Sequence, residues 1–216
     1  MNIINFKERI FTSLGLFFLI YLFFIYDFIL VFSLIVLGIG AILEFSYVIK
    51  KIFKSKSKMF FVNILFITYI FLFCIFFFYF SNFIQLKIFL FIILLGCIAS
   101  DIGGYIFGKF FKGPKLTKIS PKKTIFGAIG SVILTCIIIS ASIFYFTHKI
   151  SFEIFFISFI TSISCQVGDL FFSYIKRKAK IKDTSNLLPG HGGILDRVDG
   201  ILFGLPIGIF TIVLFY

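Results

Sequence analysis

The stretch MFFVNILFITYIFLFCIFFFYF, residues 59–80, carries no charged side chain and decides the class of fold. A helix needs about 20 predominantly apolar residues to cross the hydrocarbon core of a bilayer, and this stretch is long enough. Within lipid the backbone must satisfy its own hydrogen bonds, which a helix does along its whole length. We therefore predict a transmembrane helix over these residues.

Comparable apolar runs recur along the chain. Of the 216 residues, 60% are hydrophobic and only 14% are charged, whereas water-soluble domains carry about 25% charged residues. The sequence therefore predicts an all-α fold, a polytopic transmembrane helical bundle of about seven spans. The expected spans are 10–25, 28–49, 59–80, 88–108, 125–147, 152–175 and 198–216.

The basic residues are distributed unevenly between the two sides of these spans. Of the 21 Lys and Arg residues, 19 fall in the N-terminal segment and in the segments 50–58, 109–123 and 176–197. Only Lys87 and Lys149 fall on the opposite side. The positive-inside rule then predicts a cytoplasmic N-terminus and a multi-pass protein. The net charge of +12 is dispersed over loops, with no basic soluble domain left over, so we do not expect a nucleic-acid partner.

Three acidic residues fall inside apolar runs, namely Glu44, Asp101 and Asp169. An ionisable group at membrane depth costs about 3 kcal/mol or more, so it normally faces a polar interior and marks function. Asp101 and Asp169 lie at similar depth near the predicted cytoplasmic face, and a shared polar cavity would explain both. Glu44 is close to Lys50, so it could equally snorkel to the interface or pair with a base.

The segment SYIKRKAKIKDTSNLLPGHGGILDRVDG, residues 173–200, is the most polar part of the chain. Asp169, Ser173, Lys176 and Arg177 are spaced at i, i+4, i+7 and i+8, which places them on one face of a helix. Asp196 and Asp199 also share a face, at the start of the last span. A capped re-entry into the membrane would explain the glycines of residues 189–193, but not so many acids and bases at one rim.

This set of side chains indicates phosphate chemistry. Magnesium prefers oxygen ligands and is commonly held by one or two carboxylates together with substrate phosphates. Lys and Arg stabilise the negative charge that shifts during phosphoryl or nucleotidyl transfer. Because Asp rather than Cys or His dominates, the sequence favours Mg²⁺ over zinc.

Two further cytoplasmic features have competing interpretations. The loop KLTKISPKKT, residues 115–124, is either ordinary positive-inside charge or a clamp on an anionic substrate through Lys122 and Lys123. The segment GGYIFGK, residues 103–109, matches the spacing of a phosphate-binding loop but is followed by Phe110, where that motif needs Ser or Thr. Its glycines more simply allow helices to approach closely.

The polar segment resembles the signature of the phosphatidate cytidylyltransferase (CDP-diacylglycerol synthase) family. The pattern S-x-x-K-R-x4-K-D, continuing through P-x-H-G-G-x-x-D-R-x-D, is met over residues 173–199. The segment SPKKT at 120–124 and the pattern of Asp101, Tyr105 and Gly108 are also similar. The chain departs from the family after SPKKT, where Ile125 and Phe126 stand in place of a usual acidic residue.

The resemblance implies a magnesium-dependent transfer of CMP from CTP to phosphatidic acid, giving CDP-diacylglycerol and pyrophosphate. It implies that Asp169, Asp196 and Asp199 hold the metal ions and, with Lys176 and Arg177, form the catalytic set. The substrate-binding residues expected beside them are Asp101, Lys122, Lys123, Ser173, Lys182, Asp183, His191 and Arg197. His191 either binds a phosphate or shapes its turn.

The same resemblance suggests how the chain is divided and where it lies. Residues 1–80 are expected to form N-terminal transmembrane spans. Residues 81–216 are expected to form the catalytic transmembrane region, with cytoplasmic loops 109–123 and 176–197. The expected location is a bacterial cytoplasmic (inner) membrane, where the lipid bilayer is a partner and assembly as a homodimer is left open.

Two other functions fit parts of this pattern. A CTP-dependent lipid kinase of the dolichol-kinase type resembles the family at its C-terminal end, but would transfer the γ-phosphate. A non-catalytic transporter of anionic lipid would be expected to carry broken helices in two repeated halves, and the sequence has no such repeat. A transporter would also have no need to cluster three Asp on one side of the membrane.

Overall fold

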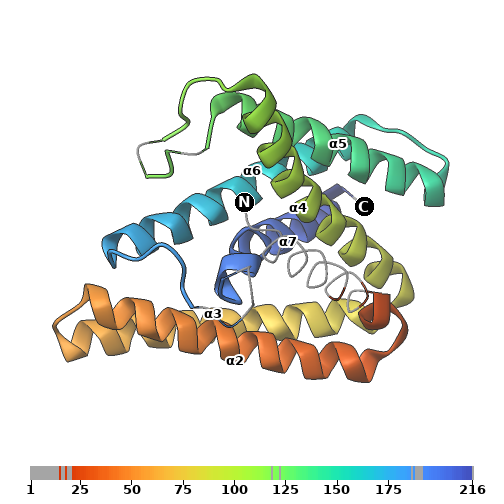
Figure 1. Ribbon diagram of the computed structural model, residues 1–216. Coiled ribbons are helices and arrows are strands. Elements are labelled where there is room, and N and C mark those ends of the chain that lie inside the picture. The colour runs from red at the N-terminus through yellow and green to blue at the C-terminus, as the bar shows by residue number, and fades with distance from the viewer. Residues whose placement is uncertain are drawn as a thin grey trace. The chain divides into compact units, whose positions relative to one another are not determined.

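The computed structural model describes residues 15, 18, 21–117, 119–121, 123–185, 187 and 192–215. Over these residues the protein is helical, apart from turns and an isolated antiparallel bridge between Lys115 and Thr124 (Figure 1). The helices are α2 (Asp27–Ile52), α3 (Lys56–Ser81), α4 (Ile84–Phe111), α5 (Ile125–Thr147), α6 (Phe152–Lys178) and α7 (Leu195–Phe215).

All six helices are long and apolar enough to cross a membrane. They confirm the predicted spans from residue 28 onward, with boundaries extended by up to four residues. Most of the predicted first span, 10–25, lies outside the described residues; its last part, 21–25, is helical. The all-α, multi-pass architecture predicted from the sequence is therefore confirmed.

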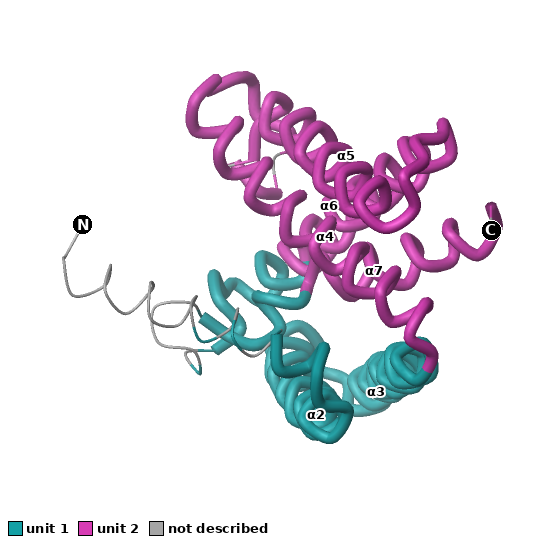
Figure 2. The backbone as a smooth tube through the Cα atoms, turned by 90° about the vertical axis from the view of Figure 1, so that its right-hand side faces the viewer, with its two compact units in different colours: residues 1–82, 175–198 teal, residues 83–174, 199–216 magenta. Residues whose placement is uncertain are grey.

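The chain divides into two compact units, coloured separately in Figure 2. Unit 1 contains the described residues up to Asn82 together with Ile175–Val198, and unit 2 contains Phe83–Tyr174 and Asp199–Tyr216. Unit 1 therefore combines α2 and α3 with the polar segment between α6 and α7. Unit 2 combines α4 and α5 with most of α6 and α7.

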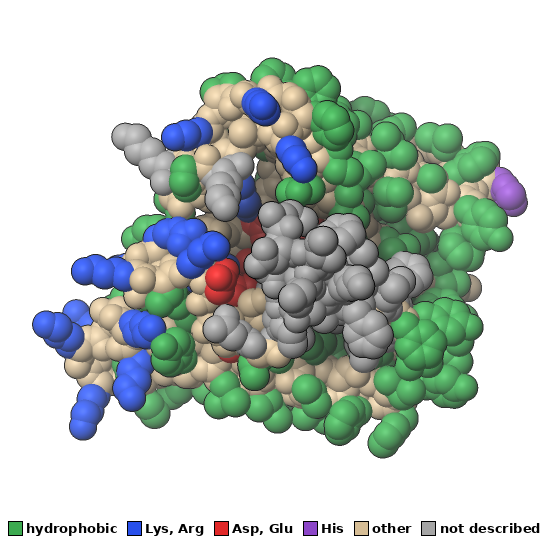
Figure 3. Space-filling view, viewed as in Figure 1, with side chains coloured by type: hydrophobic (Ala, Val, Ile, Leu, Met, Phe, Trp, Pro, Cys, Tyr) green, Lys and Arg blue, Asp and Glu red, His purple; other side chains and the backbone are tan. Residues whose placement is uncertain are grey.

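In unit 1, α2 and α3 form an antiparallel pair. The rings of Phe45 and Phe66 stack with centroids 3.8 Å apart, and the thiol of Cys74 donates to the carbonyl of Leu34. Exposed lysines follow one another where the chain passes from α2 to α3, and Figure 3 shows Lys and Arg side chains gathered at that end of the pair. This end matches the predicted cytoplasmic loop 50–58.

In unit 2, small residues let α4 and α5 approach closely. A Cβ atom at Gly103 would lie 2.5 Å from the carbonyl oxygen of Gly130, which leaves no room for a side chain. The hydroxyl of Ser131 donates to the carbonyl of Ser100 at 2.7 Å across the same contact. The prediction that the glycines of GGYIFGK serve helix packing is confirmed.

A second set of glycines packs α7 against its neighbours. Gly200, Gly204 and Gly208 recur every four residues and therefore lie along one face of α7. Added Cβ atoms at these positions would contact Cys165 and Thr161 of α6. This stripe was readable in the sequence as a repeat of small residues, and it packs the part of α7 that belongs to unit 2 against α6.

Candidate active site

In unit 2, the loop between α4 and α5 brings Lys123 onto Asp169. Helix α4 ends at Phe111, and the residue that caps it, Lys112, has a left-handed conformation (φ 40°) just before Gly113 and Pro114. The chain then doubles back, with the amide of Leu116 donating to the carbonyl of Lys123 at 2.8 Å. The ammonium of Lys123 lies 2.6 Å from Oδ2 of Asp169, with the two side chains 30% and 23% exposed.

The side chain of Thr124 fixes where this loop ends. Its hydroxyl oxygen accepts from the amide of Gly127 at 3.1 Å, which is the usual way for Thr to cap the first turn of a helix. The residue beside the cap is Lys123, so its position follows from the start of α5. Of the two lysines predicted to bind substrate here, Lys122 lies outside the described residues, whereas Lys123 contacts a predicted metal ligand.

Three acidic residues from three helices of unit 2 gather around Gly200. A Cβ atom at Gly200 would lie 3.5 Å from Oδ1 of Asp169 on α6 and 3.8 Å from Oδ1 of Asp101 on α4. Asp199 on α7 is 8% exposed, and its Oδ1 accepts from the amide of Gly200 at 3.0 Å. The glycine leaves the space between Asp101 and Asp169 open.

This arrangement fits a magnesium ion that is shared with a substrate. Two carboxylate oxygens within 4 Å of one point are sufficient, because Mg²⁺ usually takes one or two protein carboxylates and completes its shell with phosphates and water. Within the described ranges, no three His, Cys, Asp or Glu side chains form a complete metal cage by themselves. The carboxylates thus leave coordination positions of the ion open for water or phosphate oxygens.

In unit 1, Lys176 forms an ion pair with Asp196. The ammonium nitrogen lies 2.7 Å from Oδ1, and the two side chains are only 13% and 8% exposed. The other oxygen of Asp196 accepts from the amides of Thr184 and Gly193, at 2.8 and 3.1 Å. A buried carboxylate at the start of α7 is thereby held by one cation and two backbone donors, where the helix dipole also favours it.

The end of α6 turns the chain toward this pair. Lys180 has φ 57°, its amide donates to the carbonyl of Arg177, and the amide of Ile181 donates to the carbonyl of Lys176. These two bonds form a Schellman motif, the usual close of a helix, although here Lys occupies the left-handed position that Gly normally takes. The motif returns residues 182–185 toward the start of α7.

The remaining predicted residues lie around these two pairs. The guanidinium of Arg177 donates to the carbonyl of Ile181 at 3.0 Å, so part of its hydrogen-bonding capacity holds the turn. Gly192, with φ 84°, lies between Asp183 and Asp196. Ser173 is half-buried on α6, whereas Lys182, Asp183 and Arg197 are exposed. His191 lies outside the described residues.

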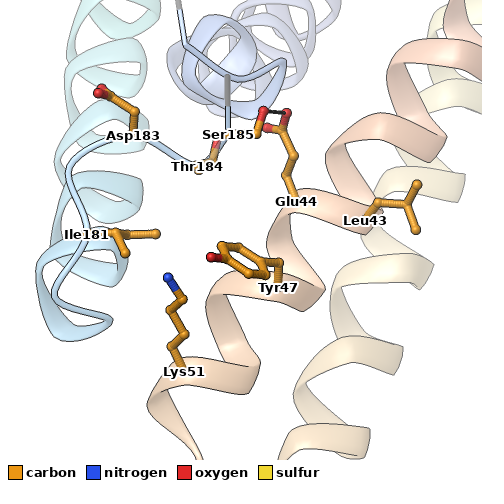
Figure 4. Close-up of a pocket in the computed structure, with 8 residues that line it drawn as sticks. All are labelled: Leu43, Glu44, Tyr47, Lys51, Ile181, Asp183, Thr184 and Ser185. Atoms are coloured by element: carbon orange, nitrogen blue, oxygen red, sulfur yellow. Dashed lines mark hydrogen bonds between the residues drawn. The ribbon is translucent and has the colours of Figure 1, made fainter. Parts of the chain in front are cut away.

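A cavity of about 480 Å³ opens beside the polar segment of unit 1 (Figure 4). Tyr47 and Lys51 line it from α2, and the ammonium of Lys51 lies 4.3 Å from the centre of the Tyr47 ring. Asp183, Thr184 and Ser185 line it from the segment after α6. Charged groups, hydroxyls and an aromatic ring together suit a polar ligand.

The sequence did not identify Glu44, Thr184 and Ser185 as parts of this region. Glu44 is 4% exposed and accepts hydrogen bonds from both hydroxyls, at 2.7 Å from Thr184 and 2.6 Å from Ser185. The available signal in the sequence was the position of this acidic residue within an apolar run. Asp169 and Asp199 belong to unit 2 and Asp196 to unit 1, so the convergence of all three on one ion stays a prediction.

These observations define the class of the protein as a helical multi-pass membrane protein with two Asp–Lys ion pairs. The model of the cytidylyltransferase family matches residues 2–215, and the chain therefore belongs to that family. This agrees with the family resemblance of the signature over residues 173–199.

Individual relatives carry a more specific name. The chain is 42% identical over 115 residues to the phosphatidate cytidylyltransferase of Helicobacter pylori (strain ATCC 700392 / 26695), covering 52% of this chain and 42% of that protein. It is 41% identical over 135 residues to the one of Rickettsia felis, covering 57% and 59%, and 40% identical over 115 residues to the one of Mycobacterium leprae, covering 52% and 36%. The matches thus span 36% to 59% of the length of these relatives.

Proposed function

We propose that this protein transfers CMP from CTP to phosphatidic acid, giving CDP-diacylglycerol and pyrophosphate. The observation that carries the proposal is the Asp–Lys pair found in each unit, Lys123 with Asp169 and Lys176 with Asp196. Each pair joins a predicted metal ligand to a predicted phosphate-binding ammonium. Membership of the cytidylyltransferase family and the names of the bacterial relatives support the same reaction.

In the proposed reaction an anionic oxygen of the phosphatidate forms a bond to the α-phosphorus of CTP. The bond from that phosphorus to the oxygen bridging to the β-phosphate breaks, and pyrophosphate leaves with the electron pair. Because the attacking oxygen is already anionic near pH 7, the step needs no general base. What it does need is compensation of charge, since both substrates are anionic.

The two lysines supply part of this compensation. In the structure each ammonium is directed by a carboxylate, and substrate phosphates can share or take over that contact because both offer anionic oxygens. Arg177, Lys182 and Arg197 add positive charge at the exposed rim. Ser173, Asp183 and His191 are also proposed to bind the substrates.

Asp169, Asp196 and Asp199 are proposed to hold magnesium, with Asp101 close to the first of them. When bound, Mg²⁺ would neutralise phosphate charge and orient the triphosphate for in-line displacement. The position of Gly200 supports this assignment, because it lies beside the carboxylates of Asp101 and Asp169 and carries no side chain of its own.

The proposed location is the bacterial cytoplasmic (inner) membrane, with the loops 109–123 and 176–197 on the cytoplasmic side, where CTP is found. We assign the catalytic region to residues 81–216. Assembly as a homodimer is compatible with this proposal, which does not require it.

The reaction is tested by supplying purified protein with phosphatidic acid, Mg²⁺ and CTP labelled at the α-phosphate. We expect label in the lipid fraction and unlabelled pyrophosphate. In a parallel reaction with CTP labelled at the γ-phosphate, the lipid should stay unlabelled. Lipid labelled only from the γ-phosphate would contradict the proposal and favour the lipid kinase, and binding of lipid without any transfer would favour the transporter.

A further inference from the structure

The carboxylate of Glu44 accepts four hydrogen bonds from the polar segment of unit 1, although Glu44 lies on α2, far from that segment in sequence. One carboxylate oxygen accepts from the amide of Ile194 at 2.9 Å and from the hydroxyl of Ser185 at 2.6 Å. The other accepts from the amide of Leu195 at 2.8 Å and from the hydroxyl of Thr184 at 2.7 Å. Figure 4 shows the carboxylate directed at Thr184 and Ser185.

These four donors lie on both sides of the turn that leads into α7. The amides of Ile194, just before α7, and Leu195, its first residue, lie at the N-terminus of the helix, where backbone N–H groups have no partner within the helix. A carboxylate there accepts charge-assisted hydrogen bonds and interacts favourably with the helix dipole. Glu44 therefore acts as a helix cap supplied by another helix.

Thr184 connects the carboxylate of Glu44 to that of Asp196. The hydroxyl oxygen of Thr184 lies 2.7 Å from Oε2 of Glu44 and 3.0 Å from Oδ2 of Asp196. The amide of Thr184 donates to the same oxygen of Asp196 at 2.8 Å. A hydroxyl has a single proton, and the shorter distance indicates that it goes to Glu44, leaving the amide as the firm donor to Asp196.

The packing around this carboxylate leaves little freedom. A Cβ atom at Gly193 would overlap both Glu44 and Thr184, and one at Gly40 would overlap the side chain of Ile194. Gly40 and Glu44 are four residues apart and thus share one face of α2. Residues 193–195 therefore pack closely against that face of α2.

We propose that Glu44 is a positioning residue that sets the orientation of Asp196, and with it Lys176, through the start of α7. As a role in catalysis this rests on the proposed function, whereas the anchoring of residues 184–195 by α2 does not. The functional region then extends beyond residues 81–216, because α2 helps to position the segment between α6 and α7.

The test replaces Glu44 with Gln, which preserves shape but presents an amide NH₂ group to donors where an oxygen had accepted two hydrogen bonds. Glu153→Gln is the matched control, since Glu153 begins α6 and has no role in the proposed site. Hydrogen exchange followed by mass spectrometry reports on the amides of residues 192–198. We expect these amides to exchange at least about tenfold faster in Glu44→Gln only, with α5 unchanged in both variants.

Activity is then measured per folded molecule, with the folded fraction determined by thermal unfolding. Substitution of groups that orient metal-site carboxylates typically costs about 10- to 100-fold in activity. We expect a fall of this size in kcat for Glu44→Gln, with a smaller change in KM for CTP. A purely structural role would reduce the folded fraction and leave kcat per folded molecule unchanged, which would overturn the positioning role.

A second pair of variants keeps the test valid if Glu44→Gln does not fold. Thr184→Ser retains the hydroxyl link between Glu44 and Asp196, whereas Thr184→Val removes it at nearly constant size. The serine variant is expected to keep near-normal hydrogen exchange and kcat. The valine variant is expected to exchange faster at residues 192–198 and to have a lower kcat. Equal behaviour of the serine and valine variants would overturn the positioning role of Glu44.

Unchanged hydrogen exchange in Glu44→Gln would overturn the anchoring of residues 184–195 by α2, whatever reaction the protein catalyses. Failure of the wild type to form CDP-diacylglycerol would count against the proposed function alone.

Discussion

Asp169→Asn is expected to lower the rate of CMP transfer on the order of a thousandfold while the protein still folds and inserts. The carboxylate contacts Lys123 and lies beside the open space at Gly200, where we place the metal. Asparagine has nearly the same shape, so the packing of α6 is preserved, but its neutral amide is a poor ligand for Mg²⁺. Losing a metal's charge stabilisation costs several kcal/mol in the transition state, and each 1.36 kcal/mol is tenfold in rate.

The control for this variant is Asp27→Asn, the same chemical change at the start of α2, which should leave the transfer rate near normal. Lys123→Met separates the carboxylate from its ion pair, because it removes the pair but keeps the charge of Asp169. We expect this variant to raise KM for a phosphate-bearing substrate and to lose less activity than Asp169→Asn. Near-normal turnover of purified Asp169→Asn would show that Asp169 is not a metal ligand.

Lys176→Met is expected to give the largest loss of stability, together with a loss of substrate binding. The Lys176–Asp196 pair is largely buried, and removal of one partner leaves the other charge uncompensated, which typically costs about 3–5 kcal/mol. The two backbone amides that still bind Asp196 place the effect toward the lower end of this range. Thermal and denaturant unfolding in detergent, with KM for CTP and phosphatidic acid, measure both effects.

The double variant Lys176→Met/Asp196→Asn should be more stable than Lys176→Met alone, since it removes the uncompensated charge as well. Lys178→Met is the matched control, because Lys178 is exposed on the same turn and its ammonium lies 5.8 Å from the centre of the Phe53 ring. Its effect should stay below about 1 kcal/mol. Unchanged stability and unchanged KM values for both substrates in Lys176→Met would remove Lys176 from the site.

Hydropathy predicted the six described spans because lipid imposes the same requirement on each of them. The predicted span 125–147 coincides with α5, where Thr124 provides a cap and His148 closes the helix in a left-handed conformation. By contrast α4 continues to Phe111, beyond the predicted end at 108. Hydropathy marks the edge of the bilayer, whereas the helix ends at the next backbone conformation that breaks it, here at Lys112.

The composition of the site could be predicted from the sequence, but its pairings could not. Clusters of Asp and Lys at the ends of apolar runs identified Asp169, Asp196, Lys123 and Lys176. Which lysine meets which aspartate depends on tertiary contacts across 46 and 20 residues of chain. Glu44 was recognised as an acid at membrane depth, but its partners are two hydroxyls and two backbone amides, and such donors leave no charge pattern in a sequence.

The central claim is that Asp169 of α6 and Asp196 of α7, both proposed metal ligands, are each required for binding of the divalent cation. Binding of Mn²⁺, a paramagnetic substitute with similar preference for oxygen ligands, can be followed by the electron paramagnetic resonance signal of the free ion, without nucleotide. The account predicts that wild-type protein and Asp27→Asn bind Mn²⁺ alike, and that Asp169→Asn and Asp196→Asn each lose that binding. Undiminished Mn²⁺ affinity in either of these two variants, with the protein folded, would contradict it.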